Sequence, residues 1–193
     1  WRSPAPHNAL TFSLNTCQSG SYSSQFSKGG SMTLTRHFTS TGFVVQNGAT
    51  LLHWHVKVKA WLPPGGHVME NEDPVQAVLR EVEEETGIQT EVITSGNPAV
   101  TLDYPTQITP PLTIMIEDID DPVQGFHQHI DFIYVCRPLH PVDAVPDGWR
   151  WVTQEELSSV VALKRDGFAA EPPPEDVRVL GEYAFQLSKG QGR

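Results

Sequence analysis

Short segments rich in apolar residues predict a run of strands in the first third of the chain. Thr41–Gln46 and Thr50–Lys57 are two such segments, and their lengths suit strands. They flank Asn47-Gly48, a dipeptide that favours two-residue hairpin turns because both residues tolerate positive φ. Ala60–Leu62 follows as a short apolar segment. We expect a hairpin followed by a third, shorter strand.

The second half of the chain contains further strand-like segments, separated by Gly, Asn and Pro residues. The strongest of them places Ile130, Phe132, Tyr134 and Cys136 on one side. The expected strands are Glu91–Ser95, Val100–Asp103, Thr113–Glu117, His129–Arg137 and Gly148–Val152.

One central helix is specified at both of its ends. Asp73 is a favourable N-cap, Pro74 fits the first helical position, and Gln76 completes a variant of the capping box. Gly87 is a typical residue for ending a helix in the left-handed conformation. Between these ends, an apolar stripe predicts the buried face, formed by Val75, Val78, Leu79 and Val82.

Two more helices are expected near the C-terminus. Thr153 and Glu156 form a capping box for a helix that runs to about Val161. A last helix follows Pro172–Pro174 and has apolar residues at helical spacing, namely Val177, Leu180, Tyr183, Ala184 and Leu187. Strands before and after a central helix, with a helix at the end, predict an α/β fold.

The N-terminal segment differs in composition from the rest of the chain. Residues 1–31 are rich in Ser, Gly and Asn and show no sustained periodicity, which is typical of a tail. A regular pattern begins just after Met32, which suits a natural start. At 193 residues, the chain fits one domain with a real core. We therefore divide it into an extension over 1–31 and a domain over 32–193.

Charge and cysteine content narrow the function classes. A net charge of −10 argues against a nucleic-acid polymer or an anionic membrane as partner. No apolar run reaches the length of a membrane span. Cys17 and Cys136 show neither zinc-site nor disulfide spacing, so we expect free thiols and a cytoplasmic location.

The candidate chemistry lies at the end of the central helix. Glu81, Glu84 and Glu85 are spaced at i, i+3 and i+4, which stacks three carboxylates on one face. Gly87 places them in the last helical turn, where each anion costs on the order of 0.3–1 kcal/mol. A hard, oxygen-preferring cation bound there would reverse these unfavourable terms. Mg²⁺ suits such an oxygen site, and Mn²⁺ is an alternative.

This stretch resembles the Nudix box, which reads Gly, five residues, Glu, seven residues, Arg-Glu-apolar-any-Glu-Glu-any-Gly-apolar. Every fixed position is matched, with no departure, by Gly66, Glu72, Arg80, Glu81, Val82, Glu84, Glu85, Gly87 and Ile88. The resemblance implies a Nudix-type α/β/α sandwich with a central mixed β-sheet. It is firmest over Gly65–Ile88 and extends, from the order of elements, over about Arg36–Leu187.

The resemblance also implies a mechanism and a set of roles. Nudix hydrolases cleave the pyrophosphate bond of a nucleoside diphosphate linked to another moiety, with Mg²⁺ or Mn²⁺. By this resemblance Glu81, Glu84 and Glu85 are catalytic metal ligands, joined by the carbonyl of Gly65. Glu72 and Arg80 are expected to brace the loop and the helix.

The general base and the substrate stay open at this stage. Glu81, Glu84 or an acidic residue near Glu117–Asp121 would serve as the base, and a solvated loop is the default expectation for that last segment. ADP-ribose, dinucleoside polyphosphates, oxidised nucleoside triphosphates and nucleotide sugars are all compatible with the box. A homodimer is plausible by resemblance. The alternatives are a non-catalytic, nucleotide-sensing Nudix module and an isoprenyl diphosphate isomerase, although the intact box favours a hydrolase.

Several residues outside the box are candidates for substrate binding. Lys57 and Lys59 lead towards the expected tight loop Pro63-Pro64-Gly65-Gly66, where a cation would meet phosphate. His129 and Asp131 alternate with His127, so all three share a face of one strand. That face is either a polar sheet edge or a phosphate and ribose contact. Tyr104 lies near the position of a tyrosine in related dinucleoside polyphosphate hydrolases.

Overall fold

A computed structural model describes residues 34–93, 102–160, 162–165 and 168–190 of the chain. Its centre is formed by three long strands, β1 (Arg36–Gln46), β2 (Ala49–His55) and β7 (Gly125–Pro138). β1 pairs with β2 in antiparallel fashion through the predicted Asn47-Gly48 turn, and it pairs with β7 in parallel over nine residues. The sheet is therefore mixed, as predicted.

The shorter strands extend this sheet on both sides. β3 (Ala60–Leu62) and β8 (Trp149–Thr153) pair with β2, and β4 (Gly65–His67) pairs with β1. β5 (Thr90–Ile93) and β6 (Thr113–Asp121) pair with β7. A separate two-stranded ribbon is formed by β9 (Leu163–Arg165) and β10 (Phe168–Glu171).

Helix α1 (Pro74–Thr86) has the caps that the sequence predicts. The carboxylate of Asp73 accepts from the N–H groups of Val75 and Gln76, at 2.8 and 3.0 Å. Gly87 follows the helix at φ 69° and donates its N–H to the carbonyl of Glu83. The apolar stripe of α1 packs on one face of the sheet, against a cluster that contains Val44, Val78, Val82, Tyr134 and Cys136.

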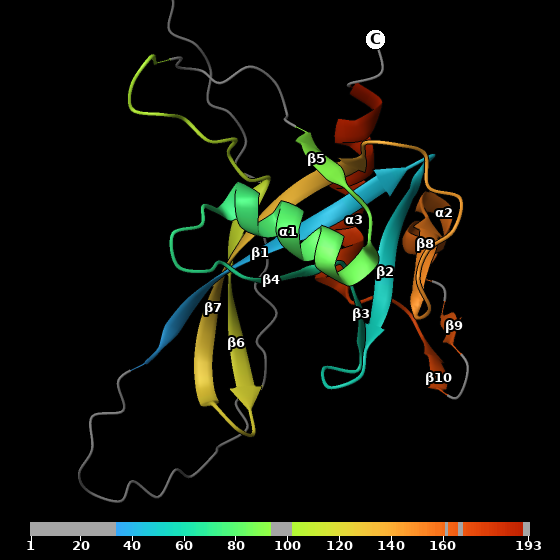
Figure 1. Cartoon of the computed structure of the whole chain (residues 1–193). Helices are drawn as coiled ribbons and strands as arrows, with labels where there is room; N and C mark the ends of the chain where they lie inside the picture. The colour runs from blue at the N-terminus through green and yellow to red at the C-terminus, as the bar shows by residue number, and fades with distance from the viewer. Residues whose placement is uncertain (1–33, 94–101, 161, 166–167, 191–193) are drawn as a thin grey trace, which may run out of the picture. The chain divides into compact units, whose positions relative to one another are not determined.

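The opposite face of the sheet carries α2 (Gln154–Ser158) and α3 (Glu175–Gly190). Along β1 and β7, every second residue faces α1, and the residues between them face α2 and α3. Both faces of these two strands are therefore apolar. In Figure 1, α1 crosses in front of β1 and α3 lies behind it. This second core layer contains Phe43, Val45, Ile133, Val135, Leu157 and Phe185. The predicted α/β/α sandwich is confirmed.

Some local predictions are wrong. Thr113–Glu117 was expected to end in a solvated loop over Glu117–Asp121, but β6 continues to Asp121 because its pairing with β7 runs to Gly125. Leu102 and Asp103 form no strand, and residues 100–101 of that expected strand lie outside the described residues. Tyr183 follows the apolar spacing expected for the last helix but is 54% exposed.

Other sequence expectations fall wholly or partly outside the described residues. These include the extension over 1–31, Cys17, Ser95 and Val161. Cys136 is a buried free thiol, and burial raises its pKa to about 12. Within the described ranges, the helices are too short or too polar for any of them to cross a membrane.

Close packing of α1 on the sheet depends on a missing side chain at Gly42. A Cβ added there would lie 2.8 Å from Cγ2 of Val78 and 3.3 Å from Sγ of Cys136. We predict that Gly42→Ala lowers the free energy of unfolding by about 1–3 kcal/mol, since overpacking strains a dense core. Urea denaturation measures the change. Gly190→Ala, where an added Cβ meets nothing within 4 Å, is the control; equal stability of both variants would contradict the prediction.

Candidate active site

Two consecutive glycines bring β4 against the acidic face of α1. Gly65 and Gly66 pair with Thr41 and Ser40 of β1. A Cβ on Gly66 would lie 2.5 Å from the carboxyl group of Glu81, so a side chain at this position would displace that carboxylate. The N–H of Gly65 points to Oε2 of Glu85 at 3.3 Å. The loop backbone and two carboxylates of the helix therefore occupy the same small region.

Arg80 is the cation at the centre of this region. Its Nε and Nη2 atoms bind the two oxygens of Glu72, at 2.8 and 2.9 Å, in a bidentate pair. Its Nη1 atom contacts Oε1 of Glu81 at 2.7 Å and Oε2 of Glu84 at 3.0 Å. The second contact is the i, i+4 pair that the helical spacing predicts.

The same guanidinium also holds the loop backbone. Nη2 of Arg80 donates to the carbonyl of His67 at 3.0 Å. Glu72 closes the loop from the other side, because its Oε2 accepts from the N–H of Met69 at 3.0 Å. The hydrogen bond from Arg80 lowers the pKa of Glu72, and the pKa of Arg80 is raised by the same contact. The pair stays ionised at neutral pH and ties the loop to the helix.

The electrostatics of the three carboxylates suit a hard cation. Burial raises the pKa of Glu85, and the nearby charges of Glu81 and Glu84 raise it further, although the N–H of Gly65 acts in the opposite direction. Arg80 offsets only part of this negative charge, since it contacts single oxygens of Glu81 and Glu84. A divalent cation with oxygen ligands would relieve the remaining repulsion. The donor set therefore fits Mg²⁺ or Mn²⁺.

The comparisons with known proteins agree with this geometry. The family model described as the NUDIX domain matches residues 36–176, which is most of the chain. The chain belongs to the Nudix family. An RNA pyrophosphohydrolase from Bartonella clarridgeiae is 30% identical over 123 residues, a match that covers 58% of this chain and 68% of that relative.

Solved structures give the same assignment. A hydrolase of the NUDIX family from Clostridium perfringens superposes with a TM-score of 0.60 at 27% identity, over 80% of this Nudix chain and 99% of that one. The MutT protein of Methanosarcina mazei Go1 has a TM-score of 0.50 at 19% identity, over 82% and 99% of the two chains, and shows the fold alone. This Nudix protein is a pyrophosphohydrolase, and enzymes of its family generally use divalent metal ions.

His129 and Asp131 lie on the sheet face opposite α1, on an interior strand, so the expectation of a polar sheet edge is wrong. Asp131 is 3% exposed, and its two oxygens accept from the hydroxyl groups of Thr39 and Thr41 at 3.0 and 2.7 Å. Burial raises the pKa of Asp131. Its carboxylate is thus occupied by the protein, and a substrate contact stays a prediction.

Three candidate substrate contacts are exposed. Lys57 and Lys59 lie in the turn between β2 and β3. The pKa of Asp121 is lowered mainly by the backbone N–H groups of Gln124 and Val123, and the charge of Lys57 adds to this effect. Tyr104 is 86% exposed in the segment before β6. Their roles in substrate binding stay predictions.

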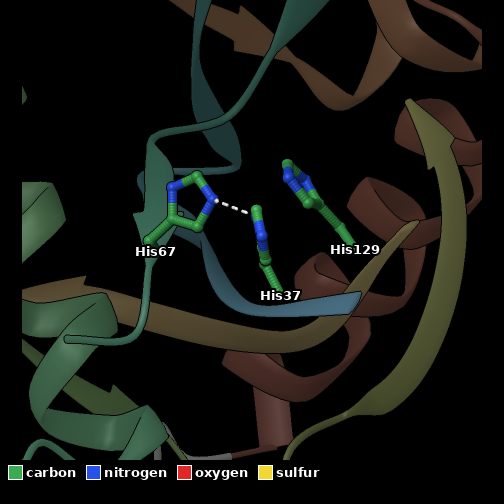
Figure 2. A group of neighbouring side chains, drawn as sticks. All are labelled: His37, His67 and His129. Carbon is green, nitrogen blue, oxygen red and sulfur yellow. Dashed lines mark hydrogen bonds between the residues drawn. The ribbon is translucent and has the colours of Figure 1, made fainter. Parts of the chain in front are cut away.

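Sequence reasoning did not single out His37 and His67, which the fold brings next to His129 (Figure 2). Burial lowers the pKa of His67, and burial together with the neighbouring imidazoles lowers the pKa of His129 to about 4. Both rings are therefore largely neutral at pH 7. His67 directly follows Gly66 in the box, but no local pattern relates it to a histidine thirty residues earlier.

Glu117 differs from the neighbouring titratable groups of β6 in the exposure of its side chain and in its pKa. Its side chain turns inward, whereas Asp118 and Asp120 are exposed. Burial, with the charges of Asp131 and Asp176, raises the pKa of Glu117 to about 7. A carboxyl group with such a pKa exchanges protons near neutral pH and is suited to act as a general base.

Removal of the Arg80 guanidinium group should lower both the stability of the protein and its rate of catalysis. We predict that Arg80→Ala lowers the free energy of unfolding by about 1–3 kcal/mol, because Glu72 and Glu81 lose a partner while largely shielded from water. Their side chains are 14% and 15% exposed. Chemical denaturation measures this loss. Arg137→Ala breaks a pair that is half exposed and should cost under about 1 kcal/mol; a similar loss in both variants would refute a bracing role.

Glu117 should make stability depend on pH. Its folded pKa of about 7 lies above the ordinary value of 4.5, so the folded state retains a proton that the unfolded chain releases. Stability therefore falls as pH rises from 4.5 to 7, and the penalty is complete above pH 7. We predict that Glu117→Gln raises Tm at pH 8 but hardly at pH 4, in thermal melts with chelator. Asp120→Asn, on the exposed side of β6, should show no such difference.

Proposed function

We propose that the chain is a Mg²⁺-dependent hydrolase of a nucleoside diphosphate linked to another moiety, with Mn²⁺ as an alternative ion. Glu81, Glu84, Glu85 and the carbonyl of Gly65 would hold the metal. When bound, the ion neutralises the diphosphate and polarises the phosphorus for attack by water. The negative net charge of the protein is compatible with phosphate binding because cations bridge the two.

One observation carries this proposal: Gly65 and Gly66 lie directly against the acidic face of α1. Gly66 leaves space that the carboxylate of Glu81 uses, and Gly65 meets Glu85. Arg80 orients Glu81 and Glu84 through one oxygen of each. A helix that served only as structure gains nothing from three carboxylates near its C-terminus, where the helix dipole opposes them.

The remaining roles follow from the same contacts. Arg80 and Glu72 position the metal ligands rather than touch the substrate, because their polar atoms are engaged with the loop and the helix. A general base must take the proton of the attacking water. Glu81, Glu84 and Glu117 are the candidates for that role. The pKa of Glu117, about 7, suits proton transfer, whereas its strand partner His129 lies on the sheet face opposite α1. The charges that act on Glu117 come from Asp131 and Asp176, not from the box.

Two substrate classes follow from different observations. The box fits small nucleoside diphosphate derivatives, and the net charge of −10 disfavours a long polyanion. The relative from Bartonella clarridgeiae is an RNA pyrophosphohydrolase, which makes a triphosphorylated RNA end the second candidate. We further propose a homodimer in the cytoplasm, both of which stay predictions. A nucleotide-sensing module without turnover is the rival from another class.

The deciding experiment is a substrate panel with Mg²⁺, with Mn²⁺ and with chelator. ADP-ribose, a dinucleoside polyphosphate, an oxidised nucleoside triphosphate, a nucleotide sugar and a triphosphorylated RNA are incubated with the enzyme, and the products are separated by chromatography. We expect metal-dependent cleavage of at least one compound. No cleavage of any compound, together with a metal-dependent rise in Tm on binding one of them, would support the sensing module instead.

The site assignment is tested by single substitutions on α1. Glu84→Gln and Glu85→Gln should lower kcat by about 100-fold or more, because each removes charge stabilisation that is needed in the transition state. Neither should lower Tm in chelator, since each relieves repulsion at the helix end. Glu83→Gln is the matched control on the same turn, where Glu83 contacts Gln89 instead. Wild-type turnover in either of the first two variants would overturn the assignment.

A further inference from the structure

Three imidazoles from three different strands converge beside the glycine loop. His37 lies on β1, His67 on β4 and His129 on β7. The sheet register brings them together, because His37 pairs with His129 across the parallel β1–β7 ladder. His67 pairs with Thr39, two residues along β1 and on the same face as His37. Figure 2 shows the three rings facing a common space.

The distances between these rings suit a shared metal ion. One ligand nitrogen from each histidine lies within 4.8 Å of the other two. Nε2 of His67 and Nδ1 of His37 are 3.3 Å apart. Zn–N bonds of about 2.0–2.1 Å at tetrahedral angles separate two nitrogens by roughly 3.3 Å. One of the three nitrogen–nitrogen distances of such a site is therefore already present. Rotation of the side chains would bring the other two to the same length.

The contact between His67 and His37 is a hydrogen bond, but hydrogen bonding does not account for His129. Nε2 of His129 is buried and has no hydrogen-bond partner among the described residues. A histidine that only fills a core normally has its ring nitrogens satisfied. His127, whose ring centroid lies 5.1 Å from that of His129, behaves in this ordinary way, since its Nδ1 lies 2.9 Å from the carbonyl oxygen of Gly125. The orphaned nitrogen of His129 points to a missing ligand.

We propose that His37, His67 and His129 form a binding site for a borderline transition-metal ion of the Zn²⁺ type, distinct from the carboxylate site. Imidazole nitrogen suits Zn²⁺, Co²⁺ or Ni²⁺, whereas Mg²⁺ takes oxygen ligands. Three protein ligands leave a fourth position for water or a substrate oxygen.

A metal at this site would cross-link the strand that carries the box glycines. His67 directly follows Gly66, and its carbonyl accepts from Arg80. Ligation of its ring would tie β4 to β1 and β7 independently of the ion pairs on the helix. The two metal sites would differ in ligand hardness, so Mg²⁺ would not compete for the three imidazoles.

The test is a titration of the metal-free protein with Co²⁺, which reports a low-coordinate nitrogen site by its visible absorption. The proposal predicts one Co²⁺ per chain in this signal, displaced by Zn²⁺ and unaffected by excess Mg²⁺. His37→Ala and His129→Ala should each weaken Co²⁺ binding by at least about 100-fold, since loss of even an outer-shell partner costs about 10–100-fold. His129→Gln, which keeps a polar side chain, should lose the site in the same way.

Two controls separate this site from the rest of the molecule. His140→Ala removes an exposed histidine outside the cluster and should bind Co²⁺ like the wild type. Glu85→Gln should also keep the signal, although it impairs the carboxylate site. Circular dichroism in chelator verifies that each variant is folded, and the rise in Tm on addition of Zn²⁺ should vanish only in the cluster variants. Wild-type Co²⁺ binding in His37→Ala and His129→Gln, or a signal lost only in Glu85→Gln, would overturn the proposal.

Discussion

The guanidinium group of Arg80 is the constraint on which the candidate site depends. It binds both oxygens of Glu72, one oxygen each of Glu81 and Glu84, and the carbonyl of His67. These partners belong to β4, to the loop before α1 and to α1 itself, so a single planar cation fixes their relative positions. A lysine could not replace it, because an ammonium group lacks the fork of donors that binds a carboxylate at two points.

Arg80 acts on a backbone that packing has already brought close. Gly42 lets α1 lie directly on β1, and Gly66 lets the carboxylate of Glu81 approach β4. Both contacts exist because a side chain is absent, and they place the acidic face beside the loop. The positive charge of Arg80 offsets part of the repulsion between the clustered carboxylates. A divalent cation would offset the repulsion that remains.

The elements themselves were largely readable from local patterns. The Asn47-Gly48 hairpin, the capping box at Asp73 and the stop at Gly87 follow from backbone preferences of single residues, and all are present. The strand conformation of Glu117–Asp121 could not be predicted from the sequence, because acidic residues next to a proline are typical of a loop. Pairing with β7 decides its conformation. Tyr183 likewise follows the helical period, yet the position of α3 on the sheet leaves it exposed.

By itself the sequence determined the box, its helix and the family, because those depend on residue types at fixed short spacings. It also supplied the i, i+4 contact of Arg80 with Glu84. Only the tertiary structure decided which distant groups meet. The parallel register of β1 and β7 sets His37 beside His129, and burial between strands and α3 raises the pKa of Glu117. Such effects depend on register and on exclusion of water, which are properties of the assembled sheet that no short segment encodes.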